Sequence, residues 1–151
     1  MTARPSPADL AEITQTLALF AHVVDNRQTD DLGLVFTEDA SVSFERSGTL
    51  LRGFDEIAAF LLRLPPDAAD HQTVNTAVLI DEDGTARALS RYISVGADGA
   101  VTNGDYEDVL VRADDGWRIR SRRIVARYPR VAADPAPRRD PAWPPSVVRL
   151  S

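Results

Sequence analysis

The pattern of apolar residues changes character at His71, and this change constrains the fold more than any other feature of the chain. From His71 onward, four runs alternate apolar and polar residues with the two-residue period of half-buried strands. They cover residues 71–81, 86–96, 101–113 and 117–128. The connections "EDGT", "ADG" and "DDG" are short, contain glycine and are typical of hairpin turns. Three successive hairpins predict an antiparallel meander.

The residues before His71 follow a helical period instead. Ser6, Pro7 and Asp9 form an N-terminal capping signal, and one apolar face follows at spacings of three and four. That face consists of Leu10, Ile13, Leu17, Phe20 and Val24. A first long helix is therefore predicted to run as far as Asp25.

Two shorter helices are expected between this helix and the meander. Thr29 and Asp30 can cap a short helix that continues to Phe36, and residues 54–64 predict a third helix, which Pro65 and Pro66 end. Short extended pieces are expected at residues 40–45 and between the glycines of "SG" and "RG". Helices first and a long meander afterwards indicate an α+β fold with the helices packed on one face of a bent sheet.

The length of 151 residues suits a single domain, which we place at residues 1–129. Residues 130–151 are rich in proline and arginine, show no period and predict an extended tail. Trp143 and the closing "VVRL" are the parts of this tail expected to dock on the body or on a partner subunit.

Composition limits the function classes. The net charge is −6 and all 17 basic residues are arginine, so the broad basic surface of a nucleic-acid-binding protein is not expected. Without cysteine there is no disulfide or thiolate site. No apolar run approaches the roughly 18 residues of a membrane helix, and the N-terminus lacks an apolar signal core. A cytoplasmic protein that binds no membrane is the default expectation.

Four segments carry a resemblance to a known family: "VVDNRQTDDLGLVFTEDASV", "LRGFDEI", "DHQTVN" and "GDYEDVLVRADDGWRIRSRRI". Together they resemble the nuclear transport factor 2-like cone fold, and more narrowly its SnoaL-like branch, which also holds scytalone dehydratase. The resemblance implies three N-terminal helices packed in the concave face of a strongly bent, mostly antiparallel sheet. It also implies a homodimer through the open face of the sheet. It does not fix the activity, because this fold hosts dehydratases, cyclases, isomerases, hydrolases and non-catalytic subunits.

Asp25 and His71 are the first candidates for catalysis. A carboxylate at a helix end beside a histidine at a strand start can fix the imidazole tautomer and raise its basicity. The pair resembles the aspartate and histidine with which scytalone dehydratase removes a proton next to a carbonyl. The chain departs from that enzyme at Val24, where a tyrosine is expected, and by lacking a second strand histidine. The bland alternatives are that Asp25 only caps a turn and that His71 is a surface residue.

Strand alternation supplies further candidates. Tyr106 and Asp108 share a face, and Asp108 is expected to pair with Arg122 across the "DDG" hairpin. In the last run, Trp117, Ile119, Ser121 and Arg123 are expected on one face, with Arg118, Arg120, Arg122 and Ile124 on the other. Asp105 or Asp108 would be the base if the chain worked like SnoaL-type cyclases.

Asn75 lies four residues after His71 and is expected on the same face, where it would bind a substrate carbonyl. His22 is expected in solvent. The side chains predicted to form the walls of the pocket are Phe20, Val24, Phe44, Phe60, Tyr92 and Trp117, with Arg122 setting its polarity.

Neither a metal-ligand motif nor a glycine-rich phosphate loop is found in the sequence, so the expected chemistry uses no cofactor. The function hypothesis is an acid–base enzyme, a dehydratase, isomerase or cyclase, that acts on a small apolar oxygenated metabolite such as a polyketide or terpenoid intermediate. Two alternatives stay open: a non-catalytic binding protein or subunit of the same fold, and a cofactor-free epoxide or ester hydrolase.

Overall fold

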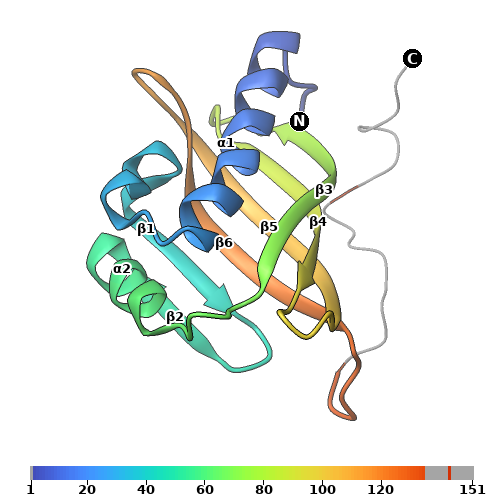
Figure 1. The fold of residues 1–151 in the computed structure, drawn as a ribbon. Coiled ribbons are helices and arrows are strands. Elements are labelled where there is room, and N and C mark those ends of the chain that lie inside the picture. Colours follow the sequence, from blue (N-terminus) through green and yellow to red (C-terminus); the bar gives the residue numbers. More distant parts are fainter. Residues whose placement is uncertain (1, 135–142, 144–151) are drawn as a thin grey trace.

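The computed structural model describes residues 2–134 and residue 143. The described part has an α+β architecture in which one curved sheet carries helices on its concave face (Figure 1). The helical elements are α1 (Pro7–Asp25), the 3-10 helix η1 (Thr29–Leu34) and α2 (Gly53–Arg63). The strands are β1 (Phe36–Phe44), β2 (Thr49–Arg52), β3 (Asp70–Ile80), β4 (Ala86–Val95), β5 (Val101–Ala113) and β6 (Gly116–Tyr128).

The six strands form one sheet in the order β2-β1-β6-β5-β4-β3. The predicted meander is confirmed, because β3 to β6 pair in sequence as antiparallel neighbours. Strand β1 pairs in parallel with β6 and antiparallel with β2, so the sheet is mixed. The parallel pairing of β1 with β6 places the N-terminal half of the chain beside its last strand.

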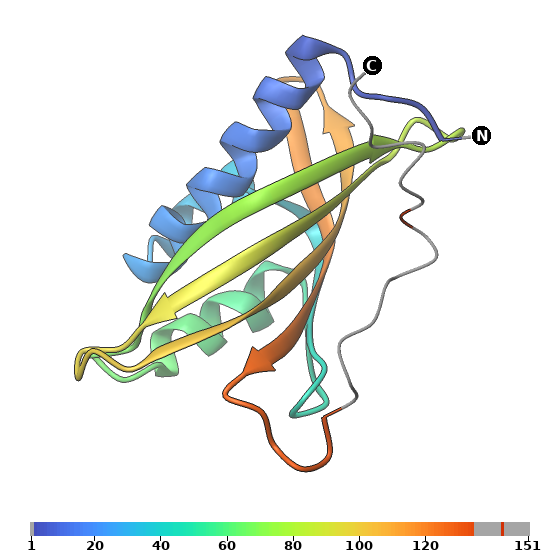
Figure 2. The same cartoon turned by 90° about the vertical axis from the view of Figure 1, so that its right-hand side faces the viewer.

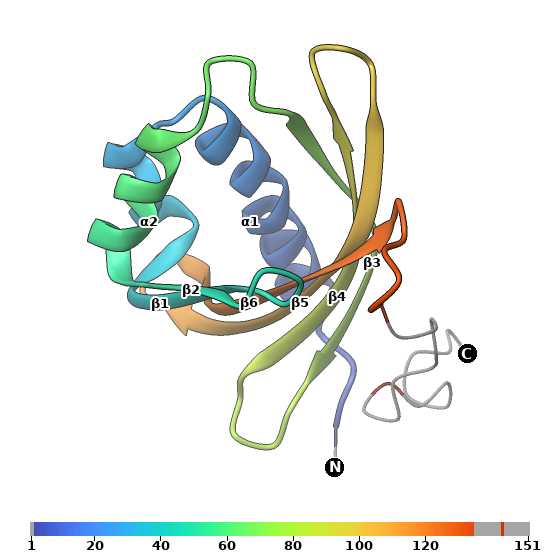
Figure 3. The same ribbon diagram turned by 90° about the horizontal axis from the view of Figure 1, so that it is seen from below.

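Helices α1 and α2 cover the concave side, which we call the inner face of the sheet (Figures 2 and 3). Helix α1 packs on β3 and β6, and α2 packs on β1 and β2. The apolar stripe predicted for α1 supplies Ile13, Leu17 and Phe20 to the core. The second of the three expected helices is the 3-10 helix η1, six residues long and containing Gly33. The structure therefore has two α-helices and one 3-10 helix in this part.

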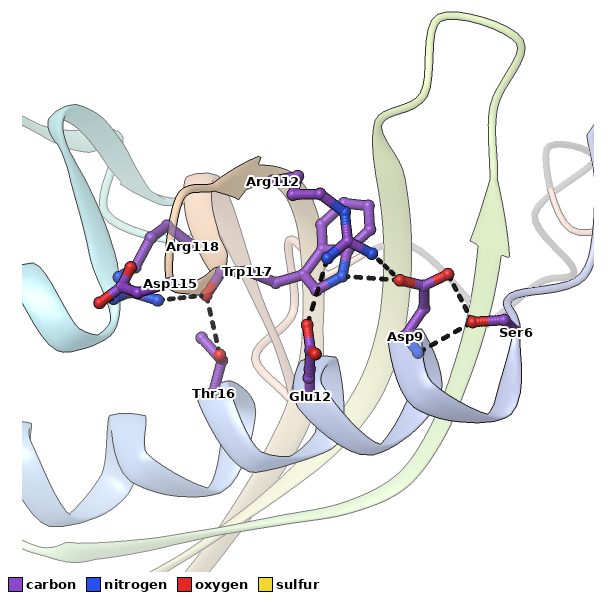
Figure 4. Close-up of polar contacts among 8 residues, drawn as sticks. All are labelled: Ser6, Asp9, Glu12, Thr16, Arg112, Asp115, Trp117 and Arg118. Atoms are coloured by element: carbon purple, nitrogen blue, oxygen red, sulfur yellow. Dashed lines mark hydrogen bonds and ion pairs between the residues drawn. The ribbon is translucent and has the colours of Figure 1, made fainter.

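A polar cluster joins the start of α1 to the β5–β6 hairpin (Figure 4). Ser6 caps α1, because its Oγ accepts a hydrogen bond from the Asp9 backbone N–H at 3.1 Å. The Asp9 carboxylate accepts hydrogen bonds from Arg112 and from Trp117 Nε1, the latter at 3.2 Å. Thr16 donates to the Trp117 carbonyl at 2.8 Å, and the Arg112 guanidinium lies 4.7 Å from the Trp117 ring centroid. We call Asp9, Thr16, Arg112 and Trp117 the hairpin clamp. It fixes the register of the helix on the sheet.

The alternation predicted for the last strand is wrong beyond Ile119. A register shift opposite Val109 and Leu110 inserts a bulge in β6. As a result Ile119 and Arg122 are both buried on the inner face, while Ser121 lies on the opposite face, which we call the outer face. A bulge depends on how two strands pair, so the period of one strand could not reveal it.

The predicted tail falls largely outside the described residues, which include only residues 130–134 and Trp143 of it. Trp143 is half-buried. In the described part, none of the helices has the length and apolarity that crossing a bilayer would take.

Candidate active site

Asp25 and His71 meet where α1 ends and β3 begins. The His71 ring nitrogen Nδ1 lies 2.7 Å from Asp25 Oδ1, and the His71 backbone N–H donates to Asp25 Oδ2 at 2.7 Å. The helix stops here because Arg27, two residues on, has a positive φ of 55° and turns the chain away. Both oxygens of one carboxylate therefore hold one histidine, by its side chain and by its main chain.

This contact fixes what the imidazole can do. A carboxylate only accepts hydrogen bonds, so Nδ1 carries the proton toward Asp25 and Nε2 is left with a free lone pair. The side chains of Asp25 and His71 are 13% and 28% exposed, so a small molecule can reach the pair while its polar bond stays partly shielded. The two residues meet as expected, and their catalytic role stays a prediction.

A row of aromatic rings leads from His71 into the core. His71 packs edge-on against Tyr92 with ring centroids 6.5 Å apart, and Tyr92 stacks on Tyr106 at 4.8 Å. Phe20 of α1 meets Tyr106 edge-on at 5.5 Å. The row, which we call the tyrosine stack, thus connects the half-buried His71 to a buried cluster on the inner face.

Gly104 makes room for the tyrosine stack. A Cβ atom at this position would lie 2.5 Å from Tyr92 Cε1 and 2.2 Å from the Val125 carbonyl oxygen. Gly104 is the cross-strand partner of Tyr92, so the tyrosine ring lies directly over the glycine backbone. Close approach of a ring to a backbone is a known use of glycine in strands. Sequence reasoning missed this role, because it needs the register between β4 and β5.

Both tyrosines are kept as phenols. Burial raises the pKa of Tyr106 far above its usual value of about 10, although the nearby Arg122 cation acts in the opposite direction. Burial also raises the pKa of Tyr92. Within the described residues neither hydroxyl forms a hydrogen bond with a protein group, so the donor of each O–H is unused.

The expected ion pair between Asp108 and Arg122 is present and fully buried. Arg122 Nε and Nη2 donate to the two Asp108 oxygens at 2.7 and 2.8 Å. The guanidinium carbon lies 3.8 Å from the Phe20 ring centroid and 4.0 Å from that of Tyr106. Both oxygens of Asp108 are engaged and its side chain is 0% exposed, which favours a role in holding Arg122 under Tyr106 over a role as a base.

The alternative base Asp105 lies on the outer face. It pairs with Arg91 and lies 3.6 Å from Arg127. Gly104 and Tyr106, on either side of it, are buried at inner-face positions of β5. Strand alternation therefore directs the Asp105 side chain to the outer face, away from His71. Asp105 and His71 therefore lie on opposite faces of the sheet.

Two predicted positions are wrong. Asn75 does not share the inner face with His71, because β3 has a register shift between Val74 and Ala77 in which Asn75 is exposed with a φ of 55°. Trp117 belongs to the hairpin clamp at the opposite end of α1, where Asp9 and Thr16 hold it. Neither side chain lies beside the dyad.

Thr73 takes the place that was expected for Asn75. It is two residues after His71, pairs across the sheet with Tyr92, and has a buried Oγ1 without a hydrogen-bond partner in the described part. Strand alternation from His71 would have found this residue. The remaining wall candidates lie on the inner side: Val24 and Phe20 are buried, and Phe44 and Phe60 pack at 5.3 Å. The exposed position of His22 is confirmed.

The comparisons with known proteins agree with this architecture. Residues 6–123 match the SnoaL-like domain family. The chain belongs to this family. The predicted membership of the SnoaL-like branch of the nuclear transport factor 2-like superfamily is confirmed.

Among relatives, the chain is 32% identical over 124 residues to the uncharacterized protein Rv2910c of Mycobacterium tuberculosis, covering 74% of this chain and 81% of that protein. ActVI-ORFA of Streptomyces coelicolor is 26% identical with a TM-score of 0.64, covering 78% and 96% of the two chains. A Novosphingobium aromaticivorans protein with the provisional name scytalone dehydratase has a TM-score of 0.71, covering 88% and 96%. At 19% identity it shows likeness of fold alone.

Across residues 2–134 and 143, no three His, Asp or Glu side chains come together in a metal-binding group. Three residues near His71 in the sheet carry hydroxyl groups: Ser94, which pairs with His71 across the sheet, and the cross-strand pair Thr73 and Tyr92.

Proposed function

We propose that the chain is an acid–base enzyme of the dehydratase, isomerase or cyclase type, with His71 as proton carrier and Asp25 as its orienting partner. The observation that carries the proposal is the double contact of the Asp25 carboxylate with the ring and the backbone of His71, each at 2.7 Å. A contact of this kind holds the imidazole in one tautomer and one orientation.

In the proposed reaction, His71 Nε2 takes a proton from the carbon next to a substrate carbonyl. The C–H electron pair moves toward the carbonyl and forms an enolate, and the imidazolium is stabilised by Asp25. In a dehydration, the enolate electrons then expel a hydroxyl from the next carbon. That hydroxyl leaves as water with the proton that His71 returns, so the enzyme ends neutral and the product contains a conjugated double bond.

The tyrosine stack supports the enolate step. A donor aimed at the oxygen where negative charge develops lowers the barrier, and a phenol with a raised pKa keeps its proton for that purpose. Tyr92 is the nearer candidate, because its ring touches His71. Tyr106 is the second and lies deeper. We assign no catalytic role to Asn75, since its side chain is outside this face.

The substrate class follows from the lining of the inner face. Aromatic rings from Phe20, Phe44 and Phe60 accompany a few hydroxyl groups, a combination that suits a flat apolar molecule with several oxygens. A polyketide or terpenoid intermediate has this chemistry. The homodimer implied by the family likeness is also a proposal, and pairing through the outer face would leave the dyad of each copy open.

The test uses a panel of cyclic β-hydroxy ketones of increasing ring number, with loss of water followed by the ultraviolet absorbance of the enone. We expect turnover by the natural chain and its loss in His71→Gln. His22→Gln is the matched control, since His22 is the exposed histidine of the same molecule. Turnover unchanged in His71→Gln would contradict the proposal. Saturable binding of the panel without any turnover would favour the non-catalytic binding protein.

A further inference from the structure

The outer face of the sheet has a hollow over β1, β6 and β5. It is a pocket of about 310 Å³ whose lining includes small side chains from three adjacent strands. Ser41 pairs with Ser121, and Ser121 pairs with Val109, so short side chains lie next to one another across the sheet. The longer side chains of Arg87, Glu107 and Arg123 also line the pocket.

Trp143 lines this same pocket. The Arg87 guanidinium carbon lies 5.6 Å from the centroid of its ring, within the range of a cation–π contact. The indole is half-buried although it is 14 residues beyond the last residue of the sequence-predicted domain, residue 129. A hollow and a large aromatic side chain that forms one of its walls therefore lie together on a face that α1 and α2 leave uncovered (Figure 3).

We propose that Trp143 is an intramolecular plug: it docks against the outer-face pocket of its own chain and competes with a second copy for this face. A tryptophan buries roughly 150–250 Å² and is among the most effective single anchors on a protein surface. The sequence "PAWPP" surrounds it with prolines, which limit the backbone freedom that docking must remove.

Chain length and charge both permit docking within one molecule. Eight residues separate Asp134 from Trp143, so nine chain steps give a reach of about 30 Å when extended. Residues 130–151 carry four Arg and two Asp, hence +2, which leaves −8 for the rest of a chain of net charge −6. Opposite signs on tail and body favour their association.

The plug and a second copy exclude each other. Two sheets that pack face to face lie about 10 Å apart, so an indole that lines the same pocket as Val109 and Ser121 occupies space that the side chains of a partner sheet need. Trp143 would therefore set the balance between monomer and dimer. This inference concerns the outer face and does not depend on the proposed acid–base activity of the inner face.

The test uses the full chain labelled with 5-fluorotryptophan, whose two tryptophans give two fluorine NMR signals. Trp143→Phe assigns them. We expect the Trp143 signal to be shielded from a soluble paramagnetic quencher at least twofold relative to the unfolded chain, at every protein concentration. Ser121→Arg, which fills the hollow, should abolish that protection. Arg91→Gln, on the outer face of the same strand as Arg87 but outside the pocket, is the control and should leave it intact.

Sedimentation of the same variants tests the blocking role. Trp143→Ala should raise the dimer fraction at a given concentration severalfold, and an unchanged fraction would overturn the competition. A Trp143 signal that is not protected from the quencher, and that is the same in Ser121→Arg, would overturn the docking of Trp143 on the outer face. Protection that appears only as concentration and mass rise would place Trp143 on a second copy and would overturn the intramolecular assignment.

Discussion

The two ends of helix α1 hold the same kind of residue in opposite circumstances. Asp9 and Asp25 lie 16 positions apart, about 24 Å along the helix, and each joins the helix to the sheet. Asp9 is near the N-terminus, where the helix dipole favours a negative charge, and it meets Arg112 and Trp117. Asp25 is at the C-terminus, where the dipole opposes its charge, and only His71 supplies its hydrogen bonds in the described part.

The two ends therefore differ in what their partner side chains can do. At the Asp9 end the partners are a guanidinium and an indole, which only donate hydrogen bonds, so this cluster can hold the helix on the sheet and do little else. At the Asp25 end the partner is an imidazole with one free nitrogen, and the phenol of Tyr92 lies beside it.

The largest effect is expected from the imidazole. His71→Gln should lower turnover by about 10² to 10⁴-fold, the usual worth of a positioned general base, with little change in melting temperature. The measurement is kcat on the β-hydroxy ketone panel together with thermal unfolding. A loss of activity that merely follows a loss of folded protein would contradict the catalytic role.

The two carboxylates should respond in opposite ways to the same change. Asp25→Asn should cost at least about 10²-fold in kcat, because the amide can orient the ring in the wrong tautomer. Asp9→Asn should leave kcat nearly unchanged and lower the free energy of unfolding by about 1 kcal/mol, through the dipole and the hydrogen bonds it weakens. Urea unfolding and kinetics on both variants separate them. Equal effects on kcat would erase the distinction between the ends.

Gly104→Ala should disturb the tyrosine stack. The added methyl would overlap Tyr92 and the Val125 carbonyl, so we expect a loss of roughly 1–3 kcal/mol in unfolding free energy and a lower kcat. Gly33→Ala is the matched control, since its Cβ would make only an ordinary contact at 3.8 Å with Phe54. If Gly104→Ala retained full activity, the position of Tyr92 would not matter to the dyad.

The smallest effect concerns alkaline pH. Because the fold raises the pKa of Tyr106 above its unfolded value near 10, the folded chain keeps a proton that the unfolded chain loses. Stability is therefore full below pH 10 and falls above it, by up to about 1.4 kcal/mol per pH unit for this group. Tyr106→Phe should flatten that fall in urea unfolding between pH 9 and 11. A slope identical to that of the natural chain would contradict the burial of the phenol.

The strands of the meander could be predicted well from the sequence. All four runs of the meander became strands within about two residues of their expected ends, because alternation and glycine turns are local signals. The meeting of Asp25 and His71 and the pairing of Asp108 with Arg122 could be predicted, since a helix end, a strand start and a tight hairpin limit where side chains can go.

What escaped prediction depends on pairing between strands. The bulge at Asn75 and the one near Ser121 each turn a residue to the other face, and no single-strand period encodes them. The stacking of Tyr92 on Tyr106 over Gly104 needs the register of β4 on β5. These features decide what lies beside the dyad, so the fold was more predictable than the site.

The backbone N–H of His71 donates to Asp25 whichever side chain residue 71 carries, proline excepted. A chain with alanine at this position would keep an aimed carboxylate beside an imidazole-sized vacancy. This variant is suited to chemical complementation, in which free imidazole or a heterocycle of different basicity is added from solution. The rate of turnover could then be measured as a function of the pKa of the added heterocycle. The same molecule would then report how strongly proton transfer limits its own turnover.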